Sequence, residues 1–191
     1  MNKAEKKILN KKLSIPLIVV LIGIIVIITS MFLPYISAQG KLAEYIDNNP
    51  DRIESKTLNL TAGDLKDVSI ISVSKLITGA YGEDDGKIAE VIVLLFSGLV
   101  AVTTLFVLLK KPIAIIIFDL LAYGAFSFLN MAIQEDFIDP DKYAWGIGYH
   151  IILLATVAIL ASAVWMLVKK IVAKKEMKAS AIVETETLVS E

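Results

Sequence analysis

The sequence predicts an all-α membrane protein, a bundle of four transmembrane helices with a partly helical extracytoplasmic loop between spans one and two. Three observations predict this fold. The 191 residues are 56% hydrophobic, whereas soluble domains are roughly 45–50% apolar. The apolar residues gather into long runs that match the ~20 residues needed to cross a hydrocarbon core. Lysines flank alternate ends of these runs, as expected for cytoplasmic connections.

The first apolar run, residues 15–36, contains no charged side chain and follows a basic arm at residues 1–14. A cleaved signal peptide would have an apolar core of about 7–15 residues and small residues before the cleavage point. This run is longer, and the best candidate cleavage point is preceded by bulky Ile36. We therefore expect a retained first transmembrane helix, which Pro34 bends or ends.

The largest polar segment, residues 37–87, carries more acidic than basic side chains and is predicted to form the extracytoplasmic loop. Leu42, Tyr45 and Ile46 have the spacing of one apolar helix face. Thr61 and Asp64 resemble the reciprocal capping box that begins a helix. We expect that second loop helix to run from there to about residue 77.

The remaining chain divides into span two at 88–109, span three at 112–134, a short outer loop at 135–142, span four at 143–168 and a tail at 169–191. The connection Lys110-Lys111-Pro112 is so short that spans two and three must be antiparallel neighbours. Asp139 and Pro140 are typical of the N-cap and first residue of a helix, here span four. The last ten or so residues lack apolar periodicity and are predicted to be unstructured.

The orientation follows from the lysines. The N-terminal arm, the Lys110-Lys111 connection and the start of the tail are basic, whereas the 135–142 loop is acidic. The positive-inside rule then predicts that both termini are cytoplasmic and that 37–87 and 135–142 face outward, in a multi-pass protein of the plasma membrane.

A polar layer is predicted within the cytoplasmic half of the spans. Asp119 lies seven residues into span three, ~10 Å from its end, and Thr103, Thr104 and Ser162 lie at similar depths on the neighbouring spans. An ionisable side chain inside a span is a candidate functional site because its burial is costly. The alternative is structural, a protonated Asp119 hydrogen-bonded to hydroxyl groups that hold the helices together.

A second candidate polar site lies in the outer leaflet and comprises His150, Ser127 and Thr29. His150 is the single histidine of the chain, and histidine is the residue type that most often serves as a pH sensor, so it is a candidate sensor. The structural alternative is a neutral imidazole hydrogen-bonded between helices.

The composition excludes most chemistry. With no cysteine and one histidine, the chain lacks the ligands of common metal sites and most catalytic groupings. It contains no phosphate-binding loop, dinucleotide fingerprint or hydrolase motif. A net charge of −1 gives no reason to expect nucleic-acid binding. We therefore expect neither an enzyme nor a cofactor.

Four spans with a large first outer loop and internal termini resemble claudins and other tetraspan proteins in topology, although the claudin loop motif of tryptophans and paired cysteines is absent. Three segments, 32–35, 64–69 and 143–149, resemble recurrent features of small four-span membrane proteins of Gram-positive bacteria. This second resemblance covers most of the chain and implies a bacterial membrane protein without implying an activity.

The leading functional hypothesis is a non-enzymatic interaction, accessory or scaffold protein that acts through the 37–87 loop. Partners would be the lipid bilayer and a protein, or a second copy, bound through that loop or through small-residue helix faces such as Ala155, Ala158 and Ser162. The alternative is a small transporter or channel-like protein that uses the Asp119 layer. A weaker alternative, which rests on analogy alone, is an immunity protein against a membrane-active peptide.

Overall fold

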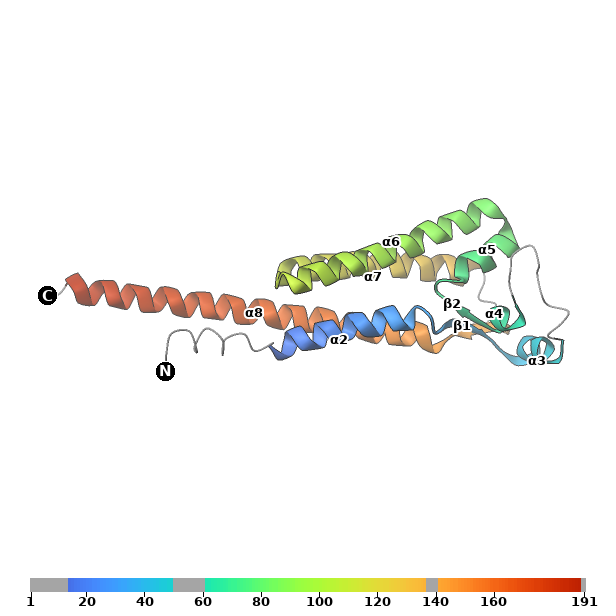
Figure 1. Ribbon diagram of the computed structural model, residues 1–191, viewed down its shortest axis with the longest axis horizontal. Coiled ribbons are helices and arrows are strands. Elements are labelled where there is room, and N and C mark those ends of the chain that lie inside the picture. Colours follow the sequence, from blue (N-terminus) through green and yellow to red (C-terminus); the bar gives the residue numbers. More distant parts are fainter. Residues whose placement is uncertain (1–13, 50–60, 137–140, 190–191) are drawn as a thin grey trace.

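The computed structural model describes residues 14–49, 61–136 and 141–189. It is mostly helical, in the order α2 (Ile15–Ser30), β1 (Pro34–Ala38), α3 (Gly40–Asn48), α4 (Ala62–Lys66), β2 (Asp67–Ser69), α5 (Val73–Tyr81), α6 (Glu83–Leu108), α7 (Pro112–Asp136), β3 (Tyr143–Trp145) and α8 (Ile147–Val189). We call the end of the bundle that carries the three strands the sheet end. The opposite end, where residues 109–111 join α6 to α7, is the turn end (Figure 1).

Three helices in the described part of the chain, α6, α7 and α8, are long and apolar enough to cross a membrane. Helix α2 is apolar but has only 16 residues, a length of ~24 Å. The structure therefore contains three candidate spans and one shorter apolar helix where the sequence predicts four spans.

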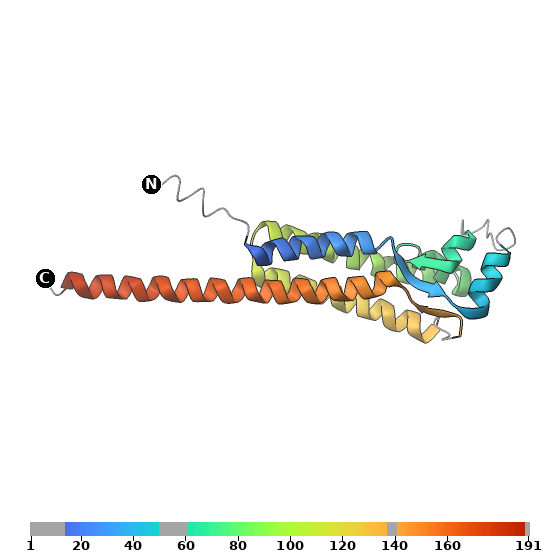
Figure 2. The same cartoon turned by 90° about the horizontal axis from the view of Figure 1, so that it is seen from below.

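The helices pack as two antiparallel pairs, α6 with α7 and α2 with α8, and α7 joins the pairs by packing on α8. The views in Figures 1 and 2 both show α2 lying along the sheet-end half of α8. On α2, Val20, Ile24 and Ile27 are buried at helical spacing. The opposite face of α2 exposes isoleucines, which suits a helix with protein on one side and lipid on the other.

The predicted helix over 15–36 is too long, because α2 ends at Ser30. Pro34 lacks the N–H that would bond to the Ser30 carbonyl, and its ring disfavours helical backbone at Leu33. The chain instead turns over residues 31–33 and enters β1, where Pro34 begins a strand. Of the two outcomes expected for Pro34, a bend or an end of the helix, the structure shows the end.

A three-stranded antiparallel sheet in the order β2-β1-β3 lies at the sheet end, whereas the sequence predicts only helices. Ile36 in the central strand pairs with Val68 on one side and Trp145 on the other. The sheet therefore joins the 37–87 segment to the segment that precedes α8.

The single loop helix predicted from Thr61 to about residue 77 is also wrong. The capping box of Thr61 and Asp64 is present and begins α4, but α4 ends at Lys66 and is followed by β2 and then by α5. Ser69 and Ser72 bond to each other's backbone N–H groups with their hydroxyls at 3.0 and 3.2 Å. Such side-chain bonds compete with helix formation and produce a turn.

Two further predictions concern α8. The fourth span was predicted at 143–168, but residues 143–145 form β3 and the helix begins at Ile147, since the Gly146 N–H bonds to the Tyr35 carbonyl at 2.8 Å. Asp139 and Pro140, like residues 1–13 and 50–60, lie outside the described residues. The last ten or so residues, which were predicted to be unstructured, continue α8 to Val189, and the lysine, glutamate and alanine residues of the tail are favourable in helices.

The turn end is built by a compact helix C-terminus. The N–H of Lys110 bonds to the Val107 carbonyl and the N–H of Lys111 to the Phe106 carbonyl, both at 3.0 Å. This is the bonding pattern of a Schellman motif, with Lys110 in the left-handed position at a φ of 52°. Pro112 then begins α7, where a missing N–H costs nothing.

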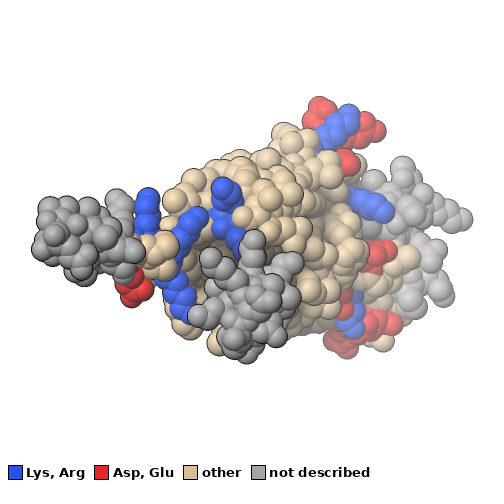
Figure 3. Space-filling view, turned by 60° about the vertical axis from the view of Figure 1, so that its left-hand side comes forward, with Lys and Arg blue, Asp and Glu red and all other residues tan. Residues whose placement is uncertain are grey.

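The two ends of the molecule differ in charge. Figure 3 shows lysines gathered on the turn end, which faces the viewer, and most of the acidic side chains at the far, sheet end. The lysines at this end of the described chain are Lys110, Lys111, Lys169, Lys170, Lys174 and Lys175. An apolar bundle with one basic end is the pattern that orients membrane proteins.

Candidate functional site

The predicted polar layer is buried in the bundle. Thr103 on α6, Asp119 on α7 and Ser162 on α8 expose 2%, 3% and 7% of their surface, and Thr104 is half-buried. Each buried residue lies one helical turn from apolar core residues of its own helix, such as Ile115 four positions before Asp119. The three helices therefore all direct one polar side chain inward at a similar depth.

The hydroxyl groups of the layer do not bond to the carboxyl group. Thr103 Oγ1 donates to the Leu99 carbonyl at 2.8 Å, and Thr104 Oγ1 donates to the Val100 carbonyl at 2.9 Å. Both bonds stay within α6, so the predicted hydrogen-bonded link from the threonines to Asp119 is not formed.

Asp119 is the one described residue with a buried side-chain oxygen that lacks a hydrogen-bond partner, its Oδ2. An unpartnered carboxylate in an apolar interior is strongly disfavoured, whereas the neutral acid is tolerated. The arrangement leaves one carboxyl oxygen of Asp119 available to a polar ligand such as water or a cation.

The second candidate site, at His150, Ser127 and Thr29, is not assembled. Thr29 and His150 are exposed and Ser127 is half-buried. Thr29 Oγ1 bonds to its own helix, to the Ile25 carbonyl at 3.0 Å. His150 points outward because Gly148 and Ile152, two positions to either side, form the buried face of α8.

A cluster of aromatic rings that the sequence did not predict joins the bundle to the sheet. Tyr35 is fully buried, its ring lies edge-on to Phe126 and Trp145 at 5.9 and 5.6 Å, and its hydroxyl donates to Asn130 Oδ1. Trp145 stacks on Tyr149 at 4.4 Å. Tyr35, Trp145 and Tyr149 lie near the outer ends of the predicted spans, where aromatic rings suit a membrane interface, but these three rings form the base of the sheet instead.

The sheet end is further braced by polar contacts among its segments. Ser37 Oγ bonds to Asp67 Oδ1 at 2.7 Å across β1 and β2, and the Tyr143 hydroxyl donates to the Leu65 carbonyl at 3.1 Å. Partial burial raises the pKa of Tyr143 above its ordinary value, so it remains a donor at neutral pH. We call the assembly of β1, β2, β3, α3 and α4 the platform.

The platform has exposed features of its own. Helix α3 is amphipathic but buries only Ile46, so the Tyr45 side chain remains 56% exposed. Lys66 on α4 forms an exposed ion pair with Asp47 on α3 at 2.6 Å, which links the two short helices weakly. Bonds from the Thr61 backbone and hydroxyl hold the pKa of Asp64 below its ordinary value.

No group of three side chains capable of holding a metal ion is found within residues 14–49, 61–136 and 141–189. No family model, curated protein or solved structure matches the chain. The candidate sites therefore stand on their geometry.

Proposed function

We propose that the protein crosses the bacterial plasma membrane four times, with both termini in the cytoplasm. Helix α2 and residues 31–33 would together make the first crossing, in addition to those of α6, α7 and α8. The exposed stripe of Ile18, Ile22 and Ile25 on α2 supports lipid contact, and the basic turn end supports a cytoplasmic position for that end.

We further propose that the protein is a non-enzymatic accessory or scaffold protein that presents the platform to a protein partner outside the membrane. The observation that carries this proposal is the sheet. It joins the segment after α2 to the segment before α8, which are far apart in the sequence, and it packs on the aromatic rings around Tyr35. A preorganised surface loses less entropy on binding than a mobile loop. Tyr45, an exposed aromatic side chain on that surface, is of the type that dominates binding energies at interfaces.

A photo-crosslinking amino acid at position 45 tests this proposal in intact membranes. It should give one discrete adduct, and the same probe at Leu120, an exposed residue of α7, should not. The captured protein, purified separately, should bind the full chain in mild detergent, and Tyr45→Ala should weaken binding about tenfold or more. Absence of a discrete adduct at 45, or equal binding by the Tyr45→Ala variant, would refute the role of the platform.

A second candidate function is proton- or ion-coupled transport through the Asp119 layer, favoured by the unpartnered Oδ2 of Asp119. In liposomes, the wild type should show a pH-dependent ion or proton flux that Asp119→Asn abolishes. Asp84→Asn, which removes an exposed acid from the first turn of α6, is the matched control and should leave the flux unchanged. If both variants behave like the wild type, Asp119 has no transport role.

A further inference from the structure

A pocket of about 520 Å³ opens at the turn end, between the end of α6, the start of α7 and the middle of α8. Most of its wall is apolar, supplied chiefly by Phe106, Leu109, Ile113, Ile117, Leu167 and Ile171. This volume lies within the range of sites that hold small molecules. The pocket is separate from the Asp119 layer and from the platform, so it serves neither function proposed above.

The charged side chains that line the pocket are all lysines. Lys111 comes from the connection just before α7, and Lys170 and Lys174 come from α8. Lys170 and Lys174 are four residues apart and so share one face of that helix. No acidic side chain lines the pocket, and within the described residues no carboxylate forms an ion pair with these lysines.

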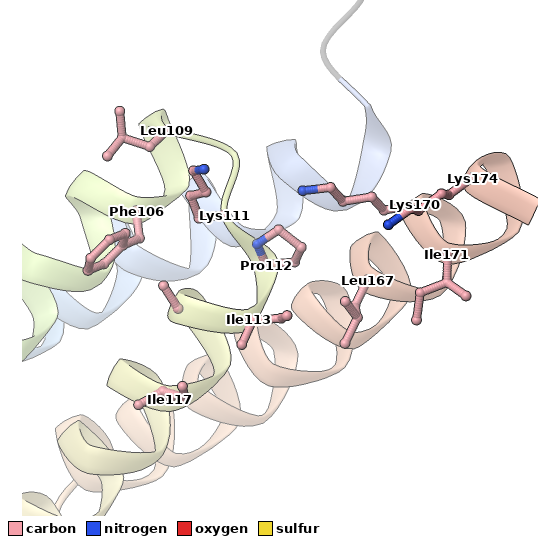
Figure 4. Close-up of a pocket in the computed structure, with 11 residues that line it drawn as sticks. Phe106, Leu109, Lys111, Pro112, Ile113, Ile117, Leu167, Lys170, Ile171 and Lys174 are labelled. Atoms are coloured by element: carbon pink, nitrogen blue, oxygen red, sulfur yellow. The ribbon is translucent and has the colours of Figure 1, made fainter. Parts of the chain in front are cut away.

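The charge and the apolar wall lie at different depths. Figure 4 shows the lysine side chains along one rim and Ile117 on the opposite side of the pocket. Along α8 the wall passes from Lys174 to Leu167, ~10 Å deeper at a helical rise. The first turn of α7 adds the partial positive charge of a helix N-terminus at the same rim.

We propose that this pocket binds one anionic phospholipid. Its phosphate would lie among Lys111, Lys170 and Lys174, and an acyl chain would lie along Leu167 and Ile117. The position of the lysines fits such a lipid because α6 ends and α7 begins here. At this level a bilayer would change from hydrocarbon to headgroups. Basic pockets between helices are suited to anionic headgroups. A zwitterionic headgroup carries its own positive charge, which would be repelled by the three lysines.

The test uses full-length protein in bilayer nanodiscs that contain equal amounts of phosphatidylcholine and phosphatidylglycerol with identical acyl chains. After transfer to neutral detergent, native mass spectrometry counts each lipid retained per chain. The wild type should retain one phosphatidylglycerol about tenfold more often than phosphatidylcholine. Equal retention of the two lipids would overturn the proposal.

Two pairs of variants separate a built site from diffuse attraction. Lys170→Gln with Lys174→Gln should remove the preference, since each lysine near an anionic headgroup contributes roughly a fivefold effect. Lys169→Gln with Lys175→Gln removes the same charge from the same helix, but these residues do not line the pocket and Lys169 lies over the Trp165 ring. An equal loss in both pairs would show that only net charge matters and would refute the site.

A third comparison tests the acyl-chain wall. Leu167→Trp fills the pocket without changing charge and should reduce lipid retention, whereas Val168→Trp alters an exposed neighbour and should not. Inorganic phosphate, added as a competitor, should fail to displace the lipid. If phosphate displaces it, or if Leu167→Trp has no effect, the site recognises phosphate alone and the proposal fails. Circular dichroism spectra should show that each variant retains the helical content of the wild type.

Discussion

The contact between Gly146 and β1 predicts the most sensitive backbone position at the sheet end. A methyl group at residue 146 would lie 2.3 Å from the Pro34 carbonyl oxygen and 2.7 Å from its carbon. Both atoms belong to the backbone, so no side-chain rotation can relieve the overlap. We predict that Gly146→Ala separates β3 from β1 and weakens the seat of the sheet on the bundle.

The magnitude follows from two contributions. Inserting a methyl group into a packed site costs about 1–3 kcal/mol. Moving Gly146 away from β1 also lengthens the 2.8 Å bond from its N–H to the Tyr35 carbonyl, and loss of such a bond costs about 1 kcal/mol. Gly146→Ala should therefore lower the free energy of unfolding by about 2–4 kcal/mol, roughly 5–15 °C in melting temperature for a chain of this size.

The assay is thermal unfolding in neutral detergent, followed by the fluorescence of Trp145. The Trp165→Phe background leaves Trp145 as the single tryptophan of the chain. Gly98→Ala is the matched control, since nothing lies within 4 Å of a methyl group at that helical position. It should be neutral or stabilising by up to about 1 kcal/mol. Equal melting temperatures for the two alanine variants would refute the close-contact reasoning.

Other predictions concern the sheet end. Tyr35→Phe should lower stability by about 1–3 kcal/mol in the same assay, because Asn130 then loses its buried donor; an unchanged melting temperature would contradict this. The pKa of Asp64 is lowered in the folded state, so its stabilisation of α4 should be present above the ordinary pKa and lost as pH falls through the lowered value. Hydrogen exchange of α4 should reveal that loss. Asp64→Asn should remove the pH dependence, whereas Thr61→Val should only reduce it, because the bond from the Thr61 backbone N–H to Asp64 remains. Asp47→Asn, which breaks an exposed ion pair, should cost less than about 1 kcal/mol, with the difference decreasing at high salt.

The sequence was informative where the interaction is local. The capping box of Thr61 and Asp64 spans four residues and is present as predicted. The end of α2 before Pro34 is also a local effect, because the proline ring removes an N–H and disfavours helical backbone at the preceding residue. The depth of Asp119 follows from the helical rise, and the residue is buried. Each of these features depends on chain geometry within one or two turns.

The sheet and the aromatic cluster could not be predicted in this way. Ile36 forms a strand because Val68 and Trp145, far away in sequence, lie on either side of it. Trp145 and Tyr149 have equally good sequence positions for a membrane interface, and the sequence alone does not show that the buried Tyr35 ring, far away in the chain, packs against both of them. In the Asp119 layer, the threonine hydroxyls bond to carbonyls four residues earlier, a choice that helical position alone does not determine.

The pairing of β1 with β3 has a consequence for biosynthesis. Ile36 emerges from the ribosome roughly 110 residues before Trp145, its partner, so the central strand must wait with one edge open while two long helices are made. At typical synthesis rates of about 5–20 residues per second, that interval lasts about 5–20 seconds. During it the exposed edge can pair with other nascent chains. Correct assembly therefore depends on the prompt synthesis of β3. A chain stalled before residue 143 would keep this strand edge open and would be a target for quality control.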